Sequence, residues 1–484
     1  MTGLGKGTLS AAEIRERLGH PVVDADGHTL EFWPALATYM RAEGIPVDTA
    51  TPRAALGLEL TWHLLSDEER ARERRTRFPW WPFPARNTLD LATAAFPRLL
   101  RSRLDELGLD FSVVYPSMGM SFLRTENAEL RQAACRALNR YHAEAFADVS
   151  DRLTPAAVVP MNTPEEAIAG LEHAVRELGL KAVLIPSFVR RRVEAVAGRP
   201  AESVADTTWL DFFGLDSVHD YDPFWARCIA LGVSPASHSG GVGWGSRRSI
   251  SSYVYNHIGN FAASGEAMCK SLFLGGVTRR NPRLRIAFLE GGVAWAVSLL
   301  NDLVSHWEKR NAAHVAMYDP AEVDRPMLDR LREEYGGAVA AAADGEGAGD
   351  WPRESPIPPH LVDEFVHCGI AEKADIARPF TANFFFGCEA DDPLVSLGFD
   401  TRLSALGVRL NAFFGSDIGH WDVPDMLGVM HEAYEAVEDG RLDPEQFRDF
   451  VFTNPVRFYV ESNPGFFSGT AVESAVESLA APTR

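Results

Sequence analysis

An aspartate and a histidine two residues apart stand at the end of the first apolar run of the chain. The stretch VVDADGHTLEFW, residues 22–33, contains Asp26 and His28 just before the run turns polar. In an extended strand, residues i and i+2 point to the same face, so these two side chains can converge on one object. Carboxylate oxygen and imidazole nitrogen both bind metal ions, so the pair predicts half of a metal site. The other ligands must come from elsewhere in the fold.

Further polar residues stand at the ends of later apolar runs: His238, Glu290, Glu389 and Asp417. If these runs are strands of one parallel barrel, their carboxyl ends meet at one face, where barrel enzymes place their catalytic residues. Nitrogen and oxygen ligands of this kind suit one catalytic zinc ion, with manganese as the main alternative, and leave a position open for water or substrate. Taken singly, each residue also has a structural explanation, such as packing for His238 or a turn for Asp417.

Eight short apolar runs provide the strands that such a site needs. Most are continuous rather than alternating, which is typical of parallel strands buried on both faces. Helical patterns separate the runs, including residues 127–149 and 163–178. The second of these segments opens with a Thr-x-x-Glu capping box. The predicted fold class is therefore α/β, a (β/α)8 TIM barrel. The eight runs are residues 21–27, 110–117, 153–162, 180–187, 231–238, 284–292, 381–389 and 408–417.

Two regions exceed a minimal barrel and are predicted insertions within a single domain of residues 1–484. Residues 34–109, after strand one, hold the charged helix SDEERARERRTR and the aromatic patch FPWWPFP, and we expect a cap or lid over the barrel mouth. Residues 310–380, between strands six and seven, include AVAAAADGEGAGDWPRESPIPP, whose small, acidic and proline-rich composition indicates a mobile loop.

Composition excludes some classes of partner. The chain has 484 residues, of which 46% are hydrophobic, and a formal net charge of −20 that repels nucleic acids and anionic membranes. Its five cysteines form no CxxC pair, which fits a reducing compartment. No stretch approaches the ~20 apolar residues of a membrane span. We expect a cytoplasmic protein whose partner is a small molecule.

Four motifs run from the first strand to the last: VDADGH, SPASHSGG, the block YVYNHIGNFAASGEAMCKSLFLGGVTRRNPRLRIAFLEGGVAW, and FFGSDIGHWD. They resemble the amidohydrolase superfamily, in the branch typified by aminocarboxymuconate-semialdehyde decarboxylase. The resemblance covers nearly the whole chain outside the two insertions. It implies one divalent metal ion, zinc or alternatively manganese, held by Asp26, His28, His238 and Asp417. It also implies a homodimer, in which an arginine of the neighbouring subunit can complete the site.

One position departs from the better-known members of that branch. They carry a histidine before the glycine pair of strand six, where this chain has Glu290 in FLEGG. A carboxylate can replace imidazole as a proton carrier only if burial raises its pKa, and Glu290 could equally be a metal ligand or structural. His257 and His420 are the other catalytic candidates. A histidine placed like His257 is more often a packing residue, while His420 either orients Asp417 or faces the substrate.

Arginines near the carboxyl end of the predicted barrel indicate what kind of substrate it could bind. Arg190, Arg191 and Arg192 directly follow strand four, where they could clamp a carboxylate, although a solvated turn explains them equally well. Aromatic residues near the rim would suit a flat conjugated ring. They are Phe188, Trp244 and Trp421.

Three functions remain open at this level. The enzyme could decarboxylate a small aromatic or conjugated carboxylic acid without a redox cofactor. It could hydrolyse an amide, ester or carbon–carbon bond, with Glu290 as the base that activates water. A non-catalytic barrel serving as a binding scaffold is the remote alternative, and it would need a broken set of ligands.

Overall fold

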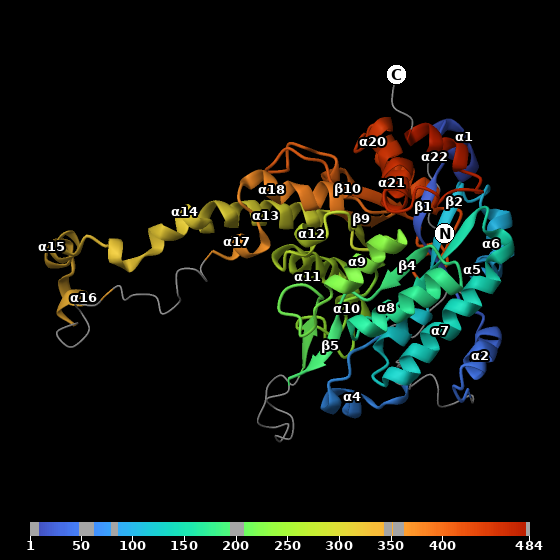
Figure 1. Cartoon of the computed structure of the whole chain (residues 1–484), viewed down its shortest axis with the longest axis horizontal. Coiled ribbons are helices and arrows are strands. Elements are labelled where there is room, and N and C mark those ends of the chain that lie inside the picture. The colour runs from blue at the N-terminus through green and yellow to red at the C-terminus, as the bar shows by residue number, and fades with distance from the viewer. Residues whose placement is uncertain are drawn as a thin grey trace.

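Eight parallel strands form the central sheet of the computed structural model, which describes residues 9–47, 62–78, 86–193, 208–342, 351 and 363–480. The strands pair in the order β1-β2-β3-β4-β7-β8-β9-β10, with helices around them (Figure 1). The predicted barrel is confirmed, and each predicted run overlaps one of its strands. They are β1 (Val23–Thr29), β2 (Phe111–Pro116), β3 (Leu153–Val158), β4 (Ala182–Ile185), β7 (Pro235–Ser237), β8 (Ile286–Phe288), β9 (Phe384–Glu389) and β10 (Asn411–Gly415).

The barrel closes between its first and last strands. The amide of Asp417 donates to the carbonyl of Asp26 at 2.9 Å, and the amide of His28 donates to the carbonyl of Ile418 at 2.7 Å. This seam brings residues that are about four-fifths of the chain apart in sequence to the same carboxyl end. It fixes the relative positions of two of the segments that were expected to carry metal ligands.

Alternate residues of the strands face two different cores, as expected for strands covered on both faces. In β2, Val113 and Tyr115 belong to one hydrophobic cluster with Ala156 of β3, whereas Val114 belongs to a second cluster with Ala157. The second cluster includes many side chains of the surrounding helices. The first includes Tyr115, whose ring lies 6.4 Å from that of His28 and therefore reaches the carboxyl end of the barrel.

Helices cover the outside of the barrel. The predicted cap of the helix at 163–178 is partly confirmed: the Thr163 side chain accepts a hydrogen bond from the amide of Glu166. The Glu166 side chain, however, does not close a capping box. It pairs with the buried guanidinium of Arg131 at 2.7 Å, because a buried positive charge is costly without an acidic partner. The helices are α1 (Ala11–Leu18), α2 (Trp33–Ala42), α4 (Asp67–Glu73), α5 (Thr88–Ala95), α6 (Pro97–Arg103), α7 (Ala128–Ala145), α8 (Pro164–Glu172), α9 (Asp222–Leu231), α10 (Tyr253–His257), α11 (Asn260–Leu274), α12 (Val277–Arg280), α13 (Ala294–Arg310), α14 (Ala312–Val315), α15 (Arg325–Tyr335), α16 (Gly337–Ala341), α17 (Glu364–Cys368), α18 (Lys373–Arg378), α19 (Val429–Glu438), α20 (Pro444–Arg448), α21 (Asn454–Val460) and α22 (Glu473–Ala480).

The segment between β1 and β2 is attached to the loop that follows β7. The amide of Arg77 donates to the carbonyl of Ser249 at 2.9 Å, and the Asn256 side chain donates to the carbonyl of Arg77 at 3.0 Å. Arg77 also lies over the Trp62 ring, 4.8 Å from its centroid. These contacts lie on the carboxyl side of β7, the side expected for a cap. Residues 79–84 of the FPWWPFP patch lie outside the described residues.

A two-stranded antiparallel hairpin and a long helical excursion complete the fold. The hairpin pairs β5 (Val189–Arg192) with β6 (Thr208–Asp211) just after β4. The excursion lies between β8 and β9, where a loop region was expected, and its described part is largely helical (Figure 1). Most of its low-complexity stretch lies outside the described residues. Within the portion of the chain that the structure covers, no helix is both long and apolar enough to cross a membrane.

Candidate metal centre

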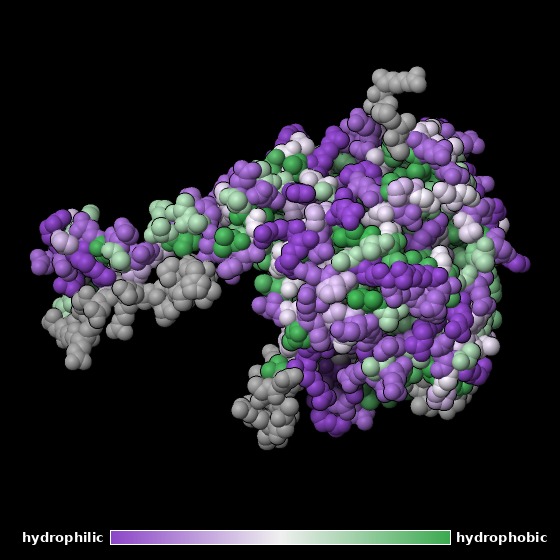
Figure 2. Space-filling model, viewed as in Figure 1, coloured by the Kyte–Doolittle hydropathy of each residue, from purple (hydrophilic) through white to green (hydrophobic). Residues whose placement is uncertain are grey.

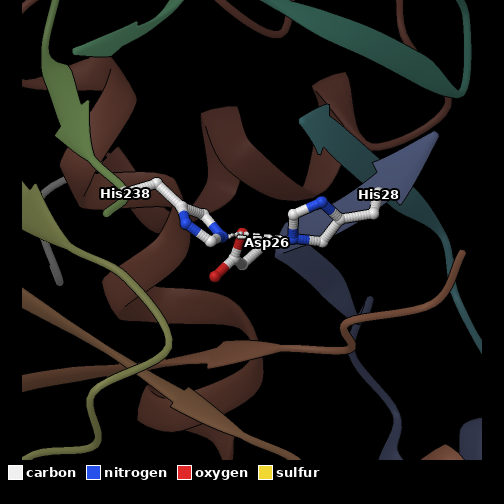
Figure 3. Close-up of side chains that lie close together, drawn as sticks. All are labelled: Asp26, His28 and His238. Carbon is white, nitrogen blue, oxygen red and sulfur yellow. Dashed lines mark hydrogen bonds and ion pairs between the residues drawn. The ribbon is translucent and has the colours of Figure 1, made fainter. Parts of the chain in front are cut away.

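Three of the predicted ligands point toward one another at the carboxyl end of the barrel. Figure 3 shows Asp26 and His28 from β1 facing His238, which directly follows β7. The Nε2 atoms of His28 and His238 lie 3.2 Å apart. The Asp26 Oδ1 atom lies 3.7 Å from the first of these nitrogens and 4.0 Å from the second. Three residues predicted from the ends of the first and fifth strands therefore lie close together in the structure.

The fourth predicted ligand, Asp417, lies between this group and a second one. Its Oδ1 atom is 3.2 Å from His28 Nε2, and its Oδ2 atom is 3.1 Å from His420 Nδ1. The same His420 nitrogen lies 2.7 Å from an oxygen of Asp422. His420 also stacks on the His28 ring, with centroids 4.6 Å apart. His420 is therefore held by two carboxylates and directly supports Asp417.

Glu290 lies on the other side of the cluster. Its Oε2 atom is 3.1 Å from His238 Nε2, and neither of its buried carboxyl oxygens has a hydrogen-bond partner. Glu290 also has a φ of 59° and Asp417 one of 50°, a left-handed conformation that is strained for residues other than glycine. The fold holds both carboxylates in place against this local preference.

The whole cluster is buried, and burial disfavours every charge in it. Burial raises the pKa of Asp26 and Asp417 well above that of an ordinary carboxyl group and raises the pKa of Glu290 to about 8. Burial also lowers the pKa of His238 to about 4. Charged carboxylates are costly here without a compensating cation, and a bound metal ion would supply one.

These residues fit a divalent metal ion. Asp26 Oδ1 and Asp417 Oδ1 are buried without a hydrogen-bond partner, so both are free to bind a ligand. Metal–ligand bonds of about 2.0–2.2 Å place neighbouring donor atoms about 3–3.5 Å apart. The 3.2 Å distances from His28 Nε2 to His238 and to Asp417 match that spacing. Two imidazoles and two carboxylates form a donor set that zinc and manganese both accept.

Asp24, a residue that the sequence motifs did not single out, holds the seam around these ligands. Its carboxylate accepts hydrogen bonds from the amides of Asp26 and Ser416 at 3.2 and 2.9 Å, and from the hydroxyls of Ser112 and Ser416 at 2.5 and 2.8 Å. A Cβ atom on Gly27 would lie 2.5 Å from this carboxylate, so only glycine fits there. Asp24 thus fixes the backbone on both sides of the metal ligands.

Replacing Asp24 with alanine should therefore weaken metal binding without removing a ligand. Two buried amides would lose their acceptor, and we expect the free energy of unfolding to fall by about 2–5 kcal/mol. Because supporting groups orient metal ligands, metal affinity should fall about 10–100-fold. Chelator competition and denaturant unfolding measure the two effects. Asp24→Asn is the control, since its amide oxygen can still accept from both backbone amides. Unchanged metal affinity in Asp24→Ala would contradict a positioning role.

His257 lies at the aromatic side of the cluster rather than among the ligands. Its ring packs against Tyr253, Trp421 and Phe261 at centroid distances of 4.9, 5.3 and 5.8 Å. Phe261 in turn lies 5.4 Å from His238. His257 is thus one aromatic ring away from the nearest predicted ligand, a position that suits packing or contact with substrate.

The three arginines after β4 do not form a clamp together. Arg191 donates to Asp211 at 2.8 Å, which joins the two strands of the β5–β6 hairpin, and to the Tyr221 hydroxyl at 2.9 Å, which attaches the hairpin to the segment before α9. Arg190 is exposed, and burial of part of its side chain together with the like charge of Arg248 lowers its pKa. Phe188 and Trp244 pack against each other at 5.1 Å, in a separate aromatic group at this side of the barrel.

Sequence reasoning missed Asp24, Asp422 and Tyr253. Two of them follow simple spacings that could have been used: Asp24 precedes Asp26 by two residues, and Asp422 follows His420 by two. Tyr253 has no such signal. Its ring packs against those of His257 and Trp421, and burial, followed by the charges of Asp422 and other carboxylates, raises the pKa of Tyr253.

Comparison with known proteins agrees with this fold. A family model described as Amidohydrolase matches residues 23–338. A solved amidohydrolase from Mycobacterium avium subsp. paratuberculosis is 16% identical, with a TM-score of 0.52 over 91% of this chain and 98% of that chain. Identity at this level shows the fold alone. Comparison with curated proteins gives no match.

Two further solved structures align over a similar length. A 2,6-dihydroxybenzoate decarboxylase from Rhizobium is 15% identical, with a TM-score of 0.47 over 91% of this chain and 98% of that chain. A dihydroxybenzoic acid decarboxylase from a Polaromonas species, with bound manganese and the inhibitor 2-nitroresorcinol, is 14% identical, with a TM-score of 0.49 over 91% and 97%.

Proposed function

This chain belongs to the amidohydrolase family, and from that premise we propose that it is a metal-dependent enzyme that decarboxylates a small aromatic or conjugated carboxylic acid. The observation that carries the proposal is an aromatic wall around a buried donor set. Phe261 lies 5.4 Å from the His238 ring, and Trp421 lies 5.8 Å from the His420 ring. A flat conjugated ring can stack against such walls while its oxygen groups face the donor atoms.

Asp26, His28, His238 and Asp417 are the residues that would hold the ion, which we propose to be zinc, with manganese as the alternative. A divalent ion bound there supplies Lewis-acid stabilisation of negative charge on substrate oxygens. The protein's own part is to hold these ligands rigidly, to exclude water through burial and to carry protons. Asp24 and His420 serve the first task by their hydrogen bonds to the ligand segments.

Glu290 is the proposed proton carrier. Both of its oxygens are buried without a hydrogen-bond partner, so the carboxyl group is free to give a proton to the substrate. In decarboxylation, the bond between the ring carbon and the carboxylate breaks, carbon dioxide leaves, and a proton takes its place on that carbon. Tyr253 and His257 line the aromatic side, where they would contact the ring rather than the breaking bond.

Hydrolysis is the second candidate, and the position of Glu290 favours it. A carboxylate 3.1 Å from a predicted ligand is well placed to take a proton from an attacking water molecule. The bond broken would then be an amide, an ester or a carbon–carbon bond. The two candidates share the metal ligands and differ in the direction in which Glu290 moves its proton. A scaffold role has no support, because the family model that matches residues 23–338 is that of an amidohydrolase.

Arg190 is the proposed partner for a second carboxylate of the substrate. It is exposed beside Arg248, whereas Arg191 is already paired with Asp211.

All five cysteines are free and buried, which supports the proposal of a reducing, cytoplasmic location. A homodimer also remains part of the proposal.

A substrate screen tests the reaction class directly. We expect the zinc- or manganese-loaded enzyme to release carbon dioxide from hydroxylated aromatic acids or dienoic acids, with a product about 44 mass units lighter, as loss of CO2 requires. Mass spectrometry of the products separates this from a gain of water. The metal-free enzyme is the control. Turnover of neutral amides or esters alone, with no carboxylic acid accepted, would contradict the proposed substrate class.

A further inference from the structure

The excursion between β8 and β9 ends in an arm that leaves the body of the protein. We define the arm as residues 311–342, which contain α14, α15 and α16. Figure 1 shows α13 leading outward from the barrel and the arm lying at its far end. None of the residues of α14, α15 or α16 is buried. The arm therefore has no hydrophobic core of its own in the part of the chain that the structure describes.

Large apolar side chains are nevertheless concentrated on the arm. Figure 2 shows hydrophobic residues gathered around α14, and exposed side chains continue along α15 and α16. Isolated exposed apolar residues are ordinary, but a contiguous set on a projecting segment marks a contact surface. The set comprises Met317 (78% exposed), Tyr318 (65%), Met327 (48%), Leu331 (41%), Tyr335 (73%) and Val339 (84%).

The spacing on α15 is symmetric. Met327, Leu331 and Tyr335 are four residues apart, so they form one stripe along the helix with Leu331 at its centre. In a two-fold contact between identical helices running antiparallel, Met327 of each copy meets Tyr335 of the other. Leu331 then meets its own counterpart on the symmetry axis. The stripe is thus complementary to a second copy of itself.

The charge of α15 argues against an anionic membrane or a polyanion as the partner of this face. Helix α15 carries three arginines and three carboxylates, so it is neutral within a chain whose net charge is −20. A helix that lies on anionic lipid, or binds a polyanion, needs an excess of cations on its polar face. A neutral helix with both signs along its sides can instead pair with an antiparallel copy without net repulsion.

We propose that the arm is the interface through which two copies of this chain associate, with α15 packing antiparallel against α15 of the second copy around Leu331. This inference concerns assembly and is independent of the reaction that the barrel catalyses. It goes beyond the expectation of a dimer, because it identifies the contact surface and its symmetry.

Sedimentation velocity of the metal-loaded wild type and of Leu331→Asp tests the proposal. We expect a wild-type dimer at about 10 µM and a Kd at least about 100-fold weaker in the variant, because two-fold symmetry buries the new charge twice. Leu331 is already partly exposed, so circular dichroism and metal content should not change. Leu403→Asp, at a similarly exposed leucine on the body, is the matched control and should remain dimeric.

A cross-linking variant tests the register. Leu331→Cys should form an intermolecular disulfide on mild oxidation, since residues on the axis can approach within the roughly 7 Å that a disulfide requires. The five native cysteines are buried and give little background. Asp329→Cys, on the opposite face of α15, should not cross-link. A wild type that stays monomeric, a dimer unaffected by Leu331→Asp, or wild-type binding to anionic vesicles that the variant loses would each overturn the proposal.

Discussion

Replacing His238 with alanine is expected to remove the metal ion and the activity together. His238 Nε2 lies 3.2 Å from His28 Nε2, and the loss of this nitrogen leaves three donors to hold one ion in a buried site. Loss of a supporting group alone typically lowers metal affinity about 10–100-fold, so loss of a ligand should exceed about 100-fold. After dialysis against metal near the wild-type Kd, occupancy should fall from about one ion per chain to less than about a tenth. Elemental analysis and turnover, measured on the same samples, check the result.

A second buried histidine supplies the control for this experiment. His142 is as buried as His238 but lies on α7, among Tyr141 and Phe146. His142→Ala removes the same side-chain volume and should lower stability without changing metal content. Full metal occupancy in His238→Ala would show that His238 is not a ligand, and loss of metal in both variants would indicate unfolding rather than a lost ligand.

Glu290→Gln should retain the metal ion and lose most of the turnover. The amide keeps the size and shape of the carboxyl group but cannot carry a proton, and general acid–base groups typically contribute about 10²–10⁴-fold to the rate. We expect kcat to fall by that factor while KM changes little, because the contacts that bind substrate remain. Steady-state kinetics and elemental analysis are the measurements. Loss of metal instead would make Glu290 a ligand, and full activity would remove it from the mechanism.

Glu389→Gln is the matched control for that variant. Glu389 ends β9, the neighbour of β8, and is partly buried, but it belongs to neither group of donor atoms that could bind a metal ion among the described residues. The same chemical change there should cost far less turnover. An equal loss in both variants would point to a general effect of charge in the pocket, rather than to proton transfer by Glu290.

The sequence by itself determined the barrel and the segments that meet at the candidate metal centre. Continuous apolar runs mark strands that are covered on both faces, and eight of them separated by helices leave few folds possible. Because the carboxyl ends of such strands meet at one face, the strand-end positions group Asp26 and His28 with the four polar residues His238, Glu290, Glu389 and Asp417. The resemblance to a known family then selected Asp26, His28, His238 and Asp417 as the predicted ligands. The apolar runs and the polar residues at their ends are local features, so they can be recognised in the linear sequence.

Other features depended on contacts that the linear sequence does not record. The carboxylate of Asp24 accepts a hydrogen bond across the β1–β10 seam. Arg191 is paired with Asp211. His257 is separated from His238 by the ring of Phe261. Each of these roles is set by which side chain reaches which partner, and that depends on loop paths and backbone conformations such as the left-handed one of Glu290. The arm is decided in the same way, since an apolar stripe on a helix indicates burial, and only the tertiary structure shows that nothing in the described part of this chain buries it.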